Sequence, residues 1–426
     1  MGGFSRQRRL IGGAIVAASA CLVAAGCGGG GASNSGSGGG GGKKKVFVAM
    51  SYSGNAWQDE ASNLALSIAR TPPYDKTVDV RREISGTEVQ AQISQYQSMI
   101  AGGAKAIVSF PVSPTGLNRV IKQGCQKGVI FVMYDATVTE PCAYNVSYIT
   151  AAPSKAEQAN GAPSTHFMGY NGMMWLANAL HGQGDIFIAR GVVGNSVDAT
   201  HYAGIKGALK KFPGIKVIDT YVGLWDSSTQ QKETTKALAA HPNVDGIWAG
   251  YGESGTLKAL KAVGKQIPVS GETSNYFRLQ LKASWPGVST GSPPAQGGIA
   301  MKVALYLLDH GTKGVPKNIE VPLPYYTAKD IKTCTGNKYS DGCNVFPPSK
   351  VPDEATAQIF EPDLLPESSL SASKTGQPTP GQKIVPLPDL NNYAQDPAER
   401  FVTRSACDPG WHQATLPEGV PGCAKG

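Results

Sequence analysis

The sequence predicts an α/β protein with two lobes, each a doubly wound parallel sheet covered by helices on both faces. Three observations carry this prediction. Short apolar runs alternate with segments of helical periodicity, the alternation starts again after about residue 151, and it stops near residue 326. Uniformly apolar runs are typical of strands buried on both faces, and strands that alternate with helices favour parallel pairing. No fixed short repeat is present, which excludes solenoids and propellers.

The first lobe is expected to span residues 45–150 and to be completed by about residues 293–325. Its strands are expected where short apolar runs are bounded by turn residues, at 46–50, 78–80, 106–110 and 129–134. Its helices are expected where apolar residues recur at helical spacing, at 57–69, 88–101 and 116–127.

The second lobe is expected over residues 151–292. Its strands are expected at 185–189, 216–221, 246–249 and 267–270. Its helices are expected at 166–180, 203–211, 229–240 and 255–263, and a final helix of the chain at 300–309. Residues 326–426 are rich in Pro, Ser, Asp and Gly, which predicts an irregular extension that wraps the lobes.

The N-terminus has the form of an export signal. The basic residues Arg6, Arg8 and Arg9 precede an apolar stretch of small residues at 10–26, and Cys27 follows directly. This arrangement resembles a bacterial lipobox, with Ala24 where leucine is commoner. The resemblance implies that residues 1–26 are removed and that Cys27 carries a lipid. An uncleaved membrane anchor is the alternative, although the apolar stretch is slightly short for one.

Residues 27–44 are dominated by glycine and serine, which predicts a flexible tether between the lipid and the lobes. With this leader the rest of the chain is expected outside the cytoplasm, anchored to the cell membrane. The formal net charge is +8, and the short Lys43–Lys45 cluster beside the tether is the longest basic run. A charge this mild, without a basic patch, disfavours nucleic-acid binding.

The cysteines support this location. The chain has eight, and six remain after Cys21 of the leader and Cys27 are set aside. An even number in an exported chain favours disulfides, although fifteen pairings are possible. Proximity in the sequence suggests Cys125–Cys142, Cys334–Cys343 and Cys407–Cys423. No CxxC pair is present, so no zinc or other metal site is expected.

Four segments resemble the type I periplasmic-binding-protein family, in particular its ribose/galactose-type sugar-binding members. They are Val46–Ser51 with Asn55–Trp57, Gly103–Val108, Phe131–Asp135 and His241–Ala249. Each is a weak motif alone, but all four occur in the family's order behind an export signal. The resemblance covers about residues 45–325 and implies the family's two-lobe fold.

In this fold the ligand lies in the cleft between the lobes, at the carboxyl ends of the strands. The candidate ligand-binding residues are therefore the polar and aromatic residues that follow the expected strands. They are Asn55, Trp57, Asp135, Arg190, Asn195, Asp198, Trp225, Asp226, Tyr251 and Glu272, with Tyr52 in the first of these loops. The resemblance implies aromatic plates at Trp57 and Trp225 and hydroxyl-binding carboxylates at Asp135 and Glu272.

The sequence departs from the ribose-binding pattern at the expected site. Ala136 and Ala199 stand where that pattern has arginine, Tyr251 where it has asparagine, and Glu272 where it has aspartate. Losing two arginines makes the cleft acidic, which disfavours an anionic ligand. A neutral sugar or polyol is expected first, and an amino-sugar or quaternary amine second, since tryptophans and acids can form a cage for a cation.

The resemblance implies a monomeric solute-binding protein that needs no cofactor and is not an enzyme. It would capture a small polar ligand and deliver it to an ABC permease in the membrane. A ligand-sensing subunit for a membrane receptor or kinase is the alternative. Gly252–Gly255 is not a nucleophile elbow, and Gly191–Asn195 lacks the lysine of a phosphate-binding loop. A repressor of the same fold would need a DNA-binding module where the export signal stands.

Overall fold

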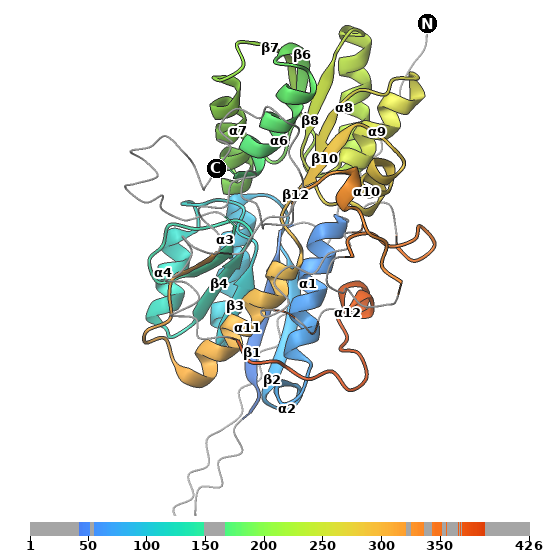
Figure 1. The fold of residues 1–426 in the computed structure, drawn as a ribbon. Coiled ribbons are helices and arrows are strands. Elements are labelled where there is room, and N and C mark those ends of the chain that lie inside the picture. The colour runs from blue at the N-terminus through green and yellow to red at the C-terminus, as the bar shows by residue number, and fades with distance from the viewer. Residues whose placement is uncertain are drawn as a thin grey trace, which may run out of the picture. The chain divides into compact units, whose positions relative to one another are not determined.

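The computed structural model describes residues 42–51, 55–148, 167–320, 325–335, 343–351 and 369–387, together with Ala355, Leu365 and Glu367. Leader and tether residues 1–41, Tyr52, Cys407 and Cys423 lie outside these ranges. Two six-stranded sheets form the described part of the chain (Figure 1). The arrangement confirms the predicted fold class. No helix of the described ranges is long and apolar enough to cross a membrane.

The first sheet has the strand order β11-β5-β4-β3-β1-β2, with every described pair parallel. Its strands are β1 (Lys44–Met50), β2 (Val78–Ile84), β3 (Ala106–Ser109), β4 (Ile130–Tyr134), β5 (Tyr144–Ser147) and β11 (Asn318–Glu320). Its helices are α1 (Ala56–Ala69), α2 (Tyr74–Thr77), α3 (Val89–Ala101), α4 (Asn118–Gln126) and α11 (Ala295–His310).

Both faces of this sheet are buried, which explains the unbroken apolar runs. Val46 and Val48 of β1 belong to the core that contains residues of α1 and α11. The intervening Phe47 and Ala49 belong to a second core that contains residues of α3 and α4. Because successive side chains of a strand point to opposite faces, a strand between two helical layers must be apolar throughout.

The second sheet has the order β12-β10-β9-β8-β6-β7, in which only the edge strand β12 (Tyr325–Tyr326) is antiparallel. Its other strands are β6 (Gln183–Arg190), β7 (Gly214–Val222), β8 (Gly246–Ala249), β9 (Val269–Gly271) and β10 (Gly287–Thr290). Its helices are α6 (Phe167–Ala179), α7 (Ser196–Leu209), α8 (Ser227–Ala240), α9 (Glu253–Ala262) and α10 (Asn275–Lys282). Again two cores lie on opposite faces, one with α6 and α7 and the other with α8, α9 and α10.

The chain exchanges lobes in its last third. After β10 it crosses through residues 291–294 to α11, which packs on the first sheet. It then adds β11 to the first sheet and β12 to the second. The crossing at residues 291–294 is the kind of connection about which two lobes can bend.

Residues 343–387, in their described parts, pack against both lobes, and we call them the strap. On the second lobe, Asn275 of α10 donates to the Phe346 carbonyl and the backbone N–H of Asn275 to that of Ala355, at 3.0 and 2.6 Å. The 3₁₀ element η2 (Ala328–Asp330), which contacts α10 of the second lobe, precedes the strap. On the first lobe, the strap helix α12 (Leu370–Thr375) lies beside α1 (Figure 1). The described part of the extension thus has attachment points on each lobe.

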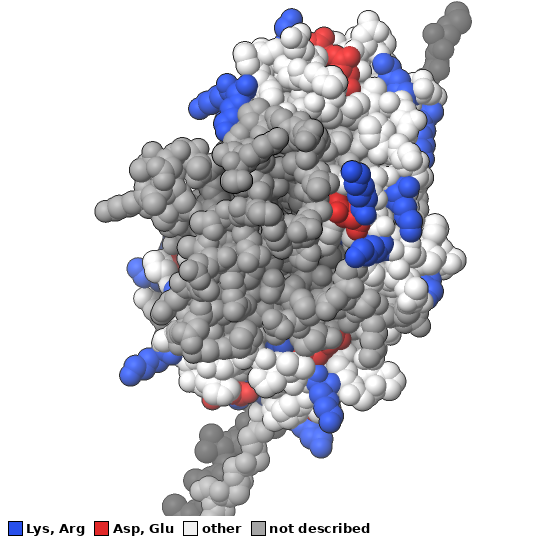
Figure 2. All heavy atoms as spheres, viewed as in Figure 1, with Lys and Arg blue, Asp and Glu red and all other residues white. Residues whose placement is uncertain are grey.

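Two disulfides agree with the pairing by proximity. Cys125–Cys142 joins the end of α4 to the segment before β5, and Cys334–Cys343 closes a loop of the extension next to the strap. The third predicted pair, Cys407–Cys423, lies outside the described residues. On the face seen in Figure 2, the Lys and Arg side chains of the described residues stand in separate small groups rather than in one patch.

Candidate ligand-binding site

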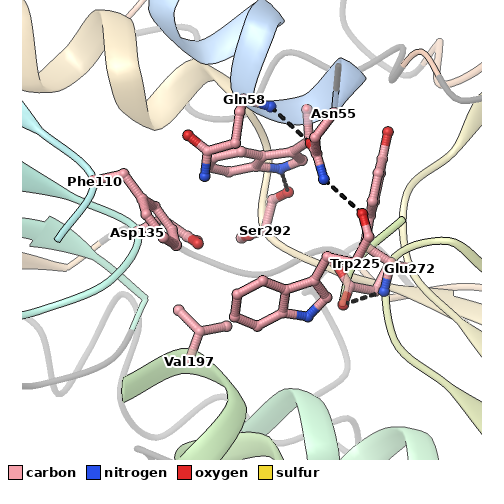
Figure 3. A pocket seen from close by; sticks show the side chains of 10 residues that line it. Asn55, Gln58, Phe110, Asp135, Val197, Trp225, Glu272 and Ser292 are labelled. Atoms are coloured by element: carbon pink, nitrogen blue, oxygen red, sulfur yellow. Dashed lines mark hydrogen bonds between the residues drawn. The ribbon is translucent and has the colours of Figure 1, made fainter. Parts of the chain in front are cut away.

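A pocket opens where the carboxyl ends of strands from the two sheets face each other (Figure 3). It leaves about 360 Å³ of space, part of it open to solvent. This size suits a small molecule. The pocket is lined by Asn55, Trp57, Gln58, Phe110, Asp135, Val197, Trp225, Tyr251, Glu272 and Ser292.

The first lobe contributes an aromatic wall centred on Trp57. The indole is 5% exposed, and its Nε1 donates to the Ser292 carbonyl over 2.6 Å. Its ring is stacked on Tyr134, with 6.3 Å between centroids and 25° between planes. Phe110, which directly follows β3, contacts the same indole edge-on at 6.5 Å. These contacts fix the ring in one orientation beside the pocket.

The second lobe contributes Trp225 from the loop after β7. This residue and Leu224 have positive φ values of 55° and 58°, which non-glycine residues seldom adopt. The indole lies against Gly191, where an added Cβ would stand 2.0 Å from the ring. The Phe110 ring meets Trp225 edge-on, with centroids 6.4 Å apart and an interplanar angle of 89°. The absence of a side chain at Gly191 thus allows Trp225 to enter the pocket.

Asp135 follows β4 and is 5% exposed. Its φ of 62° is in the left-handed region, where aspartate is better tolerated than most residues. Gln296 Nε2 donates to Asp135 Oδ1 over 3.1 Å, and the Ser147 hydroxyl donates to the Asp135 carbonyl. Burial raises the pKa of Asp135 to about 6, against opposing hydrogen bonds from Ser292 and Gln296.

Glu272 follows β9 and faces the same pocket from the second lobe (Figure 3). Its Oε1 accepts a hydrogen bond from the backbone N–H of Tyr251 over 2.7 Å. Burial raises the pKa of Glu272 well above its ordinary value, and the nearby Glu253 and Asp135 carboxylates raise it further. The two lobes therefore each place one buried carboxyl group at the pocket.

Four predicted site residues lie outside the pocket lining. Asp198 and Arg190 form an ion pair, and Asp198 Oδ1 also accepts from the Gly191 N–H over 3.0 Å. Asn195 caps α7 through the Val197 N–H, and Asp226 caps α8 through the Thr229 N–H. The Asp198 bond fixes the backbone on which Trp225 rests, so this residue supports the pocket without lining it.

Four lining residues were absent from the predicted set: Gln58, Phe110, Val197 and Ser292. Phe110 ends an expected strand, so the strand-end rule contained the signal for it. Gln58 lies in the first turn of α1, and its Oε1 accepts from the Tyr134 hydroxyl over 3.2 Å. Ser292 belongs to the crossing after β10, which has no sequence signature. Tyr52 lies outside the described residues.

The lobes also contact each other directly around the pocket. Asn55 Nδ2 donates to the Trp225 carbonyl over 2.6 Å, and Asn195 Nδ2 to the Pro111 carbonyl over 3.0 Å. The Tyr148 hydroxyl and His201 Nε2 are 2.6 Å apart, and burial lowers the pKa of His201 to about 3. The structure thus has its lobes closed upon the pocket. Within the described residues no group of three or more potential metal ligands occurs.

Comparison with known proteins identifies the class that this fold and pocket define. Residues 46–313 match the sequence profile of the family described as "Periplasmic binding protein domain", and the chain belongs to this family. A xylitol-binding protein of Mycolicibacterium smegmatis is 26% identical over 235 residues, which is 54% of this chain and 62% of that protein. A D-ribose/D-allose-binding protein of Pseudomonas aeruginosa is 23% identical over 193 residues, 43% of this chain and 56% of that protein. These alignments span about three fifths of the curated relatives' length.

Solved structures show the same fold. An ABC transporter solute binding protein from Thermobispora bispora is 25% identical, with a TM-score of 0.60, over 81% of this chain and 99% of that one. A galactofuranose binding protein is 19% identical, with a TM-score of 0.59, over 67% and 95% of the two chains. The second likeness, at its low identity, shows the fold alone.

Proposed function

We propose that this chain is an extracytoplasmic solute-binding protein that captures a small polar ligand, a sugar or polyol, between its lobes. The observation that carries the proposal is that one pocket is lined by residues of both lobes, at the carboxyl ends of their strands. A ligand there contacts both lobes only when they are closed, so its binding energy favours the closed form. The relatives that bind xylitol, ribose or allose support this class of ligand.

The lining has the chemistry that a sugar requires. A sugar or polyol presents C–H groups and hydroxyls together. The Trp57 and Trp225 rings offer apolar faces for the C–H groups. Asp135 and Glu272 offer carboxylate oxygens, which accept strong hydrogen bonds from hydroxyls once water is excluded. We assign to these four residues the main ligand contacts, with Gln58 and Tyr251 beside them.

The remaining roles follow from the family. The closed, loaded protein would dock on an ABC permease and release its ligand to it. The lipid on Cys27 and the tether of residues 27–44 would hold the binding protein, as a monomer, near that permease. A tether rich in glycine and serine keeps the binding protein near the membrane but leaves its orientation free.

A thermal-shift screen tests the proposal. Every described residue lies at or after position 42, so the chain without residues 1–41 retains both sheets. Sugars, pentitols, hexitols and amino sugars are the ligands to screen. A ligand at about 100 times its Kd should add about 2.7 kcal/mol of stability, which raises the Tm by several degrees. The shift should vanish in Trp225→Ala. A folded protein that no sugar, polyol or amine stabilises contradicts the proposal.

A further inference from the structure

The pocket holds two carboxylates, and no lysine or arginine side chain of the described residues lines it. Asp135 and Glu272 lie on opposite sides of the space in Figure 3, and each is 5% exposed. The described hydrogen bonds to the carboxylate of Glu272 reach only Oε1. The site thus presents acceptor oxygens from both lobes to whatever occupies it.

The negative charges of two other acids near the pocket, Asp198 and Asp226, are already compensated within the protein. Asp198 is paired with Arg190, and Asp226 accepts a hydrogen bond at the N-terminus of α8, where the helix dipole favours a negative charge. Asp135 and Glu272 have no such partner among the described residues. Their hydrogen bonds come from neutral groups, Ser292 and Gln296 for Asp135 and the Tyr251 N–H for Glu272.

A buried basic group, Arg278, lies near Glu253 and makes its described hydrogen bonds to other groups. Arg278 of α10 is fully buried and donates to the Ser289 hydroxyl over 2.9 Å and to the Asn344 carbonyl of the strap over 3.1 Å. Its guanidinium lies 5.0 Å above the Tyr326 ring. A further carboxylate lies close enough to Glu272 to raise its pKa: Glu253 is fully buried and accepts a hydrogen bond from the Ser274 N–H over 2.9 Å.

We propose that the physiological ligand is a polyhydroxylated molecule with a protonated primary amine, an amino sugar or amino polyol, whose ammonium binds at Asp135 and Glu272. This assignment rests on the proposed function and names its ligand class. An ammonium group has three donors and one positive charge, and two buried carboxylates that line one pocket can supply neither. Buried charges are costly unless they are paired, so the cation supplies the missing partner when the lobes close.

The remaining lining fits the rest of such a ligand. Trp57, Phe110 and Trp225 surround the space with aromatic rings, which stabilise both C–H groups and a nearby cation. The Gln58 Nε2 amide has no hydrogen-bond partner among the described residues and can donate to a ligand hydroxyl. A trimethylated ammonium would offer no N–H to the carboxylates, so the geometry favours the primary amine.

Isothermal titration calorimetry on the chain without residues 1–41 tests this assignment with matched ligand pairs. The pairs are D-glucosamine with D-glucose, D-galactosamine with D-galactose, and 1-amino-1-deoxy-D-sorbitol with D-sorbitol. At pH 7 at least one amine should bind about 10-fold or more tightly than its neutral partner, the effect expected for a buried charge-assisted contact. Glu272→Gln and Asp135→Asn should each reduce that ratio, and Glu233→Gln on the surface of α8 should not.

The pH dependence separates the two ligand types by magnitude. Closure around a neutral ligand buries both carboxyl groups without a counter-charge, which favours proton uptake, whereas hydrogen bonds from its hydroxyls favour the ionised form, so its affinity should change by less than about 3-fold between pH 7 and pH 5. Closure around an ammonium needs the carboxylates ionised, so affinity for an amine should fall about 10-fold over this range. The other titratable or charged groups that face the two acids are Glu253 on α9, Arg278 on α10, and Tyr134 and Tyr148 of the first lobe.

The possible outcomes distinguish this assignment from the proposed function. If a neutral member binds as tightly as its amine, or no amine binds while another sugar of the thermal-shift screen does, the ammonium assignment is wrong and the solute-binding function stands. If no member of the pairs or of the screen binds, both are overturned.

Discussion

The side-chain amide of Asn55 donates a hydrogen bond to the backbone carbonyl of Trp225, with 2.6 Å between Nδ2 and O. The two residues belong to different lobes, and each lines the pocket. At the same time Asn55 Oδ1 caps α1 by accepting from the Gln58 N–H over 3.0 Å. The Asn55 amide therefore both caps the N-terminus of α1 and joins the two lobes. Closure of the pocket thus depends on a residue that also positions the start of α1.

The two tasks of Asn55 can be separated by Asn55→Asp. The carboxylate keeps an oxygen that can cap α1, where a negative charge is favourable, but it has no donor for the Trp225 carbonyl. Ligand affinity should fall about 10-fold, while the free energy of unfolding changes by less than about 1 kcal/mol. Calorimetric titration and thermal denaturation of the ligand-free protein measure the two quantities.

The matched control is Asn118→Asp. Asn118 Nδ2 donates to the Thr139 hydroxyl on the exposed surface of the first lobe, so this change also removes an amide donor. Its ligand affinity should equal that of the unmodified protein. Full affinity in Asn55→Asp would show that the contact between Asn55 and Trp225 does not contribute to closure.

The position of Trp225 depends on the absence of a side chain at Gly191. An added Cβ would lie 2.0 Å from Cε2 and 2.2 Å from Nε1 of the indole, so Gly191→Ala must displace the ring. We expect ligand affinity to fall at least about 10-fold, because one aromatic face of the pocket is lost. Tryptophan fluorescence should shift as the ring becomes exposed.

Gly207→Ala in α7 is the control for Gly191→Ala. The nearest atom to its added Cβ is 3.7 Å away, an ordinary contact distance. Alanine in place of a helical glycine should stabilise the fold by about 0.4 to 1 kcal/mol and leave ligand affinity unchanged. Equal affinity in both variants would mean that Trp225 is not a ligand contact.

Asp135 should destabilise the ligand-free protein at neutral pH. Burial raises its pKa from 3.8 to about 6, so the folded state holds the proton more strongly than the unfolded state does. Its contribution therefore becomes less favourable as the pH rises from about 4 to about 6, and stays so above. Asp135→Asn should stabilise the ligand-free protein by about 1 to 3 kcal/mol at pH 7, with no gain below pH 4, in denaturant titrations.

Asp198→Asn should have the opposite effect on stability, although Asp198 is also a buried acid. Asp198 is 2% exposed but is paired with Arg190, so its replacement leaves the guanidinium without its partner. This variant should lose about 1 to 3 kcal/mol at pH 7. If both variants lose stability at neutral pH, burial does not dominate the energetics of Asp135.

Two elements that sequence analysis missed, β5 and α10, carry polar residues in buried positions. The strand β5 reads Tyr-Asn-Val-Ser, yet all four residues are buried, and the Asn145 amide takes part in hydrogen bonds with Val138 and Asn318. The helix α10 buries Asn275 and Arg278 because the strap supplies their partners. Hydrophobic periodicity does not detect buried positions that hold polar residues whose hydrogen-bond partners are distant in the sequence.

The candidate site was predicted in part, and the reason is geometric. Asp135 and Glu272 follow strands directly and Trp225 lies in the loop after β7, so the strand-end rule placed them at the pocket. Arg190 and Asp198 satisfy the same rule but form an ion pair with each other. Arg190 ends β6, and Asp198 lies in the first turn of the following helix α7. Which polar residues find partners within the protein depends on side-chain direction, and sequence spacing does not determine this.

The strap is attached to the first lobe by a buried ion pair whose removal should be measurable. Lys302 Nζ of α11 lies 3.3 and 3.4 Å from the two carboxylate oxygens of Glu367, and both side chains are 2% exposed. Glu367→Gln leaves the ammonium buried without its counter-charge, which should cost about 3 to 5 kcal/mol near pH 7. Burial also lowers the pKa of Lys302, so the loss should shrink at high pH as the amine becomes neutral.

The double variant Lys302→Met with Glu367→Gln removes both charges while it keeps an amide oxygen for the Val385 N–H, which Glu367 Oε1 binds in the structure. The double variant leaves no unpaired charge in the buried site, so it should recover most of the stability that Glu367→Gln loses. Limited proteolysis should cleave residues 376–387 faster in Glu367→Gln than in the double variant. If the double variant is as unstable and as easily cleaved as the single one, the strap is held by packing around α12 rather than by this ion pair.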